Sequence, residues 1–239
     1  MTGMDEYVSL MSSLPSTERL FLAQLPAISR LRLELRLKQL KEQDLWTLRQ
    51  VESVLNWSMQ NLASSDKELI NHAKTVFVGL QSETLKTLVR DKMELRTCIA
   101  ALRRRAQGEH APDNVNWGFG SWVSHINRNW NETHFALETV FPWLPQAKGF
   151  MDNKDAEGME RFILDLAFKQ LQRCGNQHYF DLEAVIIYVL KWDIVDRTTH
   201  YNIEAAKIKY ELQQSKCEYT CRYRAGKRPC YCQSRCCAR

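Results

Sequence analysis

An apolar stripe along Ser82–Gln107 constrains the fold of this chain more than any other feature of its sequence. Gly108 follows the stripe as a C-terminal stop. The pattern predicts one long helix, which at about 1.5 Å per residue spans roughly 39 Å. The residues of the stripe recur at helical spacing: Leu85, Leu88, Val89, Met93, Ile99 and Leu102.

The composition favours helices in the rest of the chain as well. Nine Gly and six Pro among 239 residues fall below the average usage of about 7% and 5%. Few residues are therefore suited to turns and hairpins. Apolar residues make up 44% of the chain, and seven Trp add bulk to a continuous core. We expect an all-α fold, an irregular multi-helix bundle.

Glycine and proline divide the chain into two packed helical halves. Gly108, Pro112, Gly118 and Gly120 interrupt the helical pattern. We predict an N-terminal helical half over 1–107 and a C-terminal helical half over 108–214. The basic, cysteine-rich tail over 215–239 is expected to be disordered.

The N-terminal half carries helix-start signals before the long stripe. Ser16 begins a short helix that Pro26 ends, Asp44 caps a helix that continues to Met59, and Ser65 forms a capping box with Glu68 for a helix to Lys74.

The segment Ser29–Leu40 carries leucines on two sides. Their alternation resembles a strand, but no β-branched residue, Gly or Pro lies between Ser29 and Trp46, which favours a helix. We predict a helix packed on both faces. We also expect that Asp in place of Leu35 of this helix, or of Leu88 on the Ser82–Gln107 stripe, unfolds the protein. One face holds Ile28, Leu31 and Leu35, and the other holds Leu33, Leu37 and Leu40.

The C-terminal half is rich in aromatic residues. Trp122, Ile126 and Trp130 lie four residues apart on an expected helix. The stretch 142–145 is expected to form a turn that leads into a polar loop. Helices are then predicted over Asp155–Cys174, Asp181–Arg197 and about Asn202–Gln214.

The net charge of +5 comes from the tail. Lys216–Arg239 contains seven basic residues and one acid, so the tail carries +6 and the remaining 215 residues carry −1. Six cysteines, whose spacing matches no zinc or iron–sulfur signature, are candidate metal ligands in the tail. They are Cys217, Cys221, Cys230, Cys232, Cys236 and Cys237.

No recognised catalytic or cofactor motif occurs in the sequence. The glycines have neither P-loop nor dinucleotide-fingerprint spacing, and the six His residues form no His-Glu-x-x-His pattern. We expect no enzyme activity, no cofactor and no small-molecule substrate. No apolar run approaches the ~20 residues of a membrane-spanning helix, so we expect a cytoplasmic protein whose membrane contact is indirect.

The alternative function is that of a nucleic-acid-binding or regulatory helical protein. Arg103-Arg104-Arg105, with Arg90, Lys92 and Arg96 on the preceding turns, resembles a phosphate-binding surface. Arginine at a helix C-terminus also stabilises the helix dipole, and the body's charge of −1 argues against a general nucleic-acid surface. Nucleic acid is therefore not the expected partner, and any such binding would use the basic, cysteine-rich tail and the Arg103 cluster.

Several segments resemble a group of uncharacterised bacterial proteins associated with V/A-type ATPases. They are Tyr7–Pro15, Ile28–Leu31, Glu94–Arg96 with Ala101–Arg104, Trp117-Gly118, Trp130, and Tyr188, Trp192 and Arg197. The resemblance covers roughly Glu6–Gln214 and does not include the tail.

That group is similar to the all-helical C or d subunit of these ATPases. The resemblance implies a non-catalytic part that couples the central stalk to the membrane rotor ring, with stalk and proteolipid-ring subunits as partners. It also implies a peripheral position on the inner face of the cytoplasmic membrane.

Overall fold

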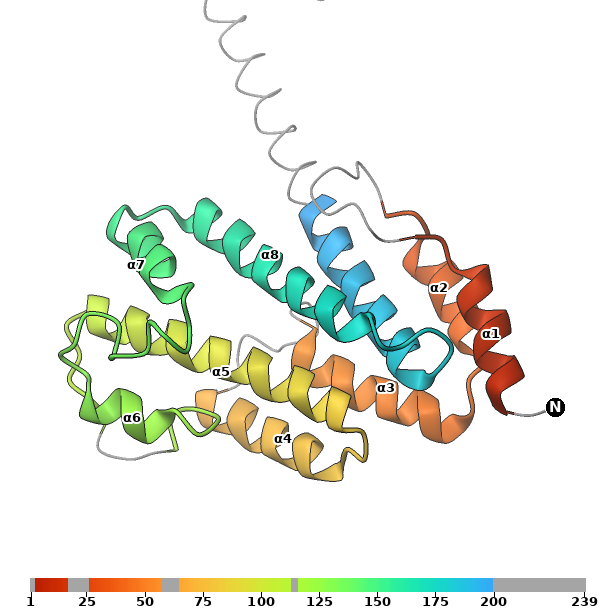
Figure 1. Ribbon diagram of the computed structural model, residues 1–239, viewed down its shortest axis with the longest axis horizontal. Helices are drawn as coiled ribbons and strands as arrows, with labels where there is room; N and C mark the ends of the chain where they lie inside the picture. Colours follow the sequence, from red (N-terminus) through yellow and green to blue (C-terminus); the bar gives the residue numbers. More distant parts are fainter. Residues whose placement is uncertain (1–2, 17–25, 57–64, 113–115, 200–239) are drawn as a thin grey trace, which may run out of the picture.

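The computed structural model describes residues 3–16, 26–56, 65–112 and 116–199 (Figure 1). These residues form helices and no strands, so the predicted all-α class is confirmed. The described part contains α1 (Gly3–Ser13), α2 (Arg30–Leu37), α3 (Glu42–Leu55), α4 (Asp66–Gly79), α5 (Glu83–Ala106), α6 (Val123–Arg128), α7 (Leu144–Asp152), α8 (Ala156–Gly175) and a further helix over 182–199.

The long helix α5 is the central element of an elongated molecule. It contacts α3, α4, α6, α7 and α8. Figure 1 shows α6 and α7 at one end of the long axis and α1 and α2 at the opposite end. The fold therefore places short helices at both ends of a body built along α5.

Two apolar cores lie along α5. The first core takes residues from α1 to α4, the first half of α5, the later part of α8 and the 182–199 helix. The second core takes residues from the second half of α5, from α6 and α7, and from the first part of α8. Helices of both predicted halves thus share the first core, and the boundary at 107–108 stays a prediction.

The capping signals in the sequence set several helix starts. Glu68 N donates to Ser65 Oγ at 3.3 Å, and Ser65 N donates to Glu68 Oε2 at 3.0 Å, which completes the predicted capping box. Asp155 Oδ1 accepts from Gly158 N at 2.8 Å and begins α8 as predicted. Gly108 ends α5 with φ +80°, a conformation that glycine adopts readily.

The prediction that the Ser29–Leu40 helix packs on both faces is wrong. Leu33 and Leu37 are completely buried, but Leu31 is 72% and Leu35 55% exposed. The helix also ends at Leu37. Leu35 therefore lies outside the core, whereas Leu88 is buried as predicted.

Other departures occur where neighbouring elements decide the local structure. Asp44 is not a cap, because α3 already begins at Glu42, and its carboxylate accepts from Tyr7 Oη at 2.7 Å. α4 continues past Lys74 to Gly79, where burial of Val76 offsets its weak helix propensity.

The aromatic segment also differs from the prediction. α6 covers only Val123–Arg128, so Trp122 and Trp130 flank the helix. The expected polar loop after Pro142 is instead α7, which begins at Leu144 because Pro145 fits the first turn of a helix. The helices predicted from Ser16 and over Asn202–Gln214, and the tail, lie outside the described residues.

Candidate functional site

The predicted metal ligands of the tail, Cys217 to Cys237, lie outside the described residues. Cys98 is buried in the second core. Burial, with a contribution from the Glu94 carboxylate, raises the pKa of its thiol to about 12. Cys98 therefore stays protonated at neutral pH and is a poor nucleophile or metal ligand.

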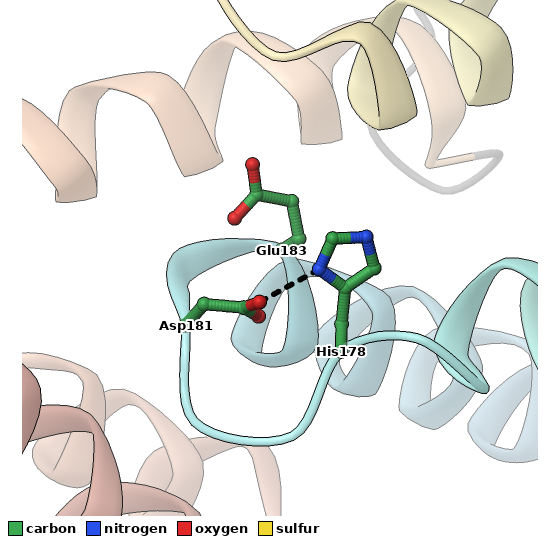
Figure 2. A group of neighbouring side chains, drawn as sticks. All are labelled: His178, Asp181 and Glu183. Atoms are coloured by element: carbon green, nitrogen blue, oxygen red, sulfur yellow. Dashed lines mark hydrogen bonds and ion pairs between the residues drawn. The ribbon is translucent and has the colours of Figure 1, made fainter.

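A cluster of His178, Asp181 and Glu183 brings three potential metal ligands within 4.8 Å of one another (Figure 2). His178 Nδ1 is 2.7 Å from Asp181 Oδ2, and its Nε2 is 3.0 Å from Thr84 Oγ1. The other Asp181 oxygen accepts from the Ala184 amide at 2.8 Å. The pair therefore caps the 182–199 helix and joins it to the start of α5, which gives His178 and Asp181 a structural role.

Two of the arginines considered as phosphate-binding candidates, Arg104 and Arg105, are engaged in structural contacts. Arg104 forms an ion pair with Asp66 at 3.4 Å and lies over the Trp117 ring. Arg105 donates to the carbonyls of Trp130, Glu132 and Thr133. These contacts hold the 116–135 segment on α5 and do not favour the nucleic-acid alternative.

Lys92, predicted as part of the same basic surface, is buried instead. It lines a small cavity of about 30 Å³ with Asp193 of the 182–199 helix. Burial lowers the pKa of Lys92 well below its usual range and raises the pKa of Asp193 to about 6. The cavity is far smaller than the roughly 300–1,000 Å³ of small-molecule sites. Lys92 and Asp193 therefore face a small internal space between α5 and the 182–199 helix.

A larger groove of about 560 Å³ lies beside α5 and α8. Its lining includes Phe141 and Trp143 on the apolar side and Arg173 on the polar side. Gln170 Nε2 donates to Asp91 Oδ2 at 2.7 Å along this lining. Burial raises the pKa of the Cys174 thiol in this lining, which makes that thiol a weaker nucleophile.

Residues that carry the family resemblance meet at helix contacts. Trp192 Nε1 donates to the Ile28 carbonyl at 2.7 Å, and Arg30 lies over the Trp192 ring. Arg197 donates twice to Glu160 Oε1, at 2.8 and 2.6 Å. Segments far apart in sequence are thus joined across the first core and at the 182–199 helix.

The Trp117-Gly118 segment packs closely on α5. Phe119 N donates to Thr97 Oγ1 at 2.9 Å, and Ser121 N donates to Glu94 Oε1 at 3.2 Å. Gly120 has φ +97°, and a Cβ there would lie 2.4 Å from Glu94. Glycine is therefore required for this approach.

Sequence reasoning missed the buried acids Glu52, Glu94 and Asp193. The available signal for Lys92 was its position three residues after Val89 and four after Leu88, on the apolar stripe itself.

Eight large apolar side chains are exposed in the described part of the chain. Most of them lie on α1, α2, α3, α4 and the connection before the 182–199 helix, whereas Val140 lies between α6 and α7. Seven of these residues are Val8, Leu31, Leu35, Trp46, Val78, Tyr179 and Phe180.

None of the described helices is both long and apolar enough to span a membrane. Comparisons with protein-family models, with curated proteins and with solved structures give no match to this chain.

Proposed function

We propose that this chain is a non-catalytic helical subunit or assembly partner of a bacterial V/A-type ATPase, positioned between the central stalk and the membrane rotor ring. The observation that carries the proposal is the position of α5. Its first half is packed in one core and its second half in the other. A continuous helix embedded in two close-packed cores resists bending, as a part that transmits torque must.

The distribution of chemistry supports a mechanical role. The polar clusters among the described residues act as helix caps or join helices, as at His178–Asp181 and Arg197–Glu160. Burial raises the pKa of the Cys174 thiol in the groove of about 560 Å³, so this thiol is not activated. Binding of other proteins is therefore favoured over catalysis.

The residues of the resemblance also support the proposal, because many of them hold the helices together. Trp192, Arg30 and Ile28 join α2 to the 182–199 helix, and Glu94 holds the 117–121 segment on α5. Such residues would preserve a rigid shape, which is the property a coupling part requires.

Purification of the tagged full chain from its native host in mild detergent, followed by mass spectrometry, tests the proposal. Stalk and proteolipid-ring subunits are expected in the eluate in fixed proportion to the chain. Recovery of the chain alone, or with nucleic acid that is released steeply by salt, contradicts the proposal and favours the nucleic-acid alternative.

A further inference from the structure

The exposed side of α2 presents two leucines one helical turn apart. Leu31 and Leu35 are among the most exposed large apolar residues of the described chain, whereas Leu33 and Leu37 of the same helix are completely buried. Arg32 and Lys38 are exposed around the leucine pair. We call Leu31, Arg32, Leu35 and Lys38 the α2 face.

The α2 face carries positive charge, and the one acid of its own segment is already paired. The only acid within 30–41 is Glu34, and its carboxylate is bound by Arg30 at 2.5 Å and by Arg49. Arg36 points elsewhere, because it donates to the Ser13 carbonyl of α1. A molecule docked on Leu31 and Leu35 therefore faces the positive charge of Arg32 and Lys38.

A binding partner has to match both the leucine pair and the charge. Two leucines at i and i+4 form a straight apolar stripe, which a second helix covers with residues at the same spacing. Basic side chains beside such a stripe favour acidic side chains beside the stripe of the partner, as at the flanks of a coiled coil.

We propose that the α2 face binds an amphipathic helix of another protein, with apolar residues one turn apart and acidic residues beside them. The sequence pattern supports this assignment. A helix with leucines on two sides can be buried on both, and the described chain buries only one side of α2. The inference rests on the proposed function only for the partner's identity, a V/A-type ATPase subunit.

Site-specific photo-crosslinking in the native host tests this surface. The full chain carries p-benzoylphenylalanine in place of Leu35, and mass spectrometry identifies the segment attached to it. The expected adduct is an acidic, amphipathic helical segment of another protein. The double variant Arg32→Glu, Lys38→Glu is expected to reduce that adduct at least tenfold. The same probe in place of Val78, an even more exposed apolar position outside the face, should not form it.

Several results would overturn the inference. The first is an adduct with the wrong molecule: this chain itself, a second copy of it, lipid, or a segment that lacks acidic residues. The second is the absence of any adduct. The third is an adduct that still forms in the double charge-reversal variant. Circular dichroism of each variant checks that the helices are retained, as expected for substitutions of exposed residues.

The two proposals fail separately. An acidic helix from a protein outside the ATPase would leave the α2 face in place and contradict the proposed function. Co-purification of ATPase subunits without the expected adduct would leave the function in place and contradict the α2 face.

Discussion

Charged side chains inside this protein lie where helices meet, and opposite charges or hydrogen bonds accompany them. The Glu52 carboxylate on α3 has a side chain only 1% exposed and lies 2.8 Å from Arg30 and 2.5 Å from Arg49. A buried ion set of this kind adds little net stability, but removal of one member leaves the others without compensation. The ion set joins α2 to α3 through Arg30 and Glu52.

Asp193→Asn is expected to stabilise the protein at neutral pH. Burial raises the pKa of Asp193 to about 6, whereas a carboxyl group in an unfolded chain titrates near 3.9. The folded state therefore binds the proton more tightly, and the contribution of Asp193 to stability falls as the pH rises from about 4 to about 6. The variant should gain about 2 kcal/mol at pH 7 and little at pH 4.

Urea unfolding at both pH values measures this difference. Asp193 lies near Lys92, Arg30, Glu52 and Asp196. A variant that is less stable than the wild type at pH 7 would show that a neighbouring cation needs the Asp193 carboxylate, which contradicts the expected sign.

At the scale of elements, helix starts were predictable wherever a local side chain sets them. Ser65, Ser82 and Asp155 each accept a hydrogen bond from an amide three residues later, so a short stretch of sequence contains the whole signal. The covered face of α2 was not predictable, because it depends on which distant helices pack against it. That Asp193 and Lys92 line the same cavity was not predictable for the same reason, because they come from two helices far apart in sequence.

Leu33→Asp is expected to unfold the protein, whereas Leu35→Asp is expected to leave it folded. Leu33 is completely buried, so a carboxylate there loses packing and hydration, at a cost of about 3–5 kcal/mol or more. Leu35 is 55% exposed, and its replacement should change the free energy of unfolding by about 0.5 kcal/mol or less. Thermal unfolding of the two variants checks this. Equal destabilisation would mean that α2 is covered on both sides within the chain.

Gly120→Ala is expected to loosen the 117–121 segment from α5. The substitution forces a side chain into φ +97° and towards Glu94, and should destabilise the protein by about 1–3 kcal/mol. The matched control is Gly149→Ala within α7, where a Cβ meets nothing within 4 Å and alanine should stabilise the helix by up to about 1 kcal/mol. Chemical denaturation of both variants measures the difference, and a neutral Gly120→Ala would contradict the described approach.

At the scale of the whole molecule, the two ends have different surfaces. The end with α1 and α2 presents exposed apolar residues and the basic α2 face (Figure 1). The end with α6 and α7 adjoins the groove that Phe141 and Trp143 line. A body with two distinct ends can hold two different partners at a fixed separation, which is the geometry that coupling between stalk and ring requires.

Cross-linking mass spectrometry of the complex purified from the native host tests this account most directly. Lysines mark both ends: Lys38 and Lys41 near α2, and Lys148 and Lys154 near α7. The account predicts that the first pair cross-links to one ATPase subunit and the second pair to a different one. Cross-links from both ends to a single protein, or to no ATPase subunit, would contradict the coupling role.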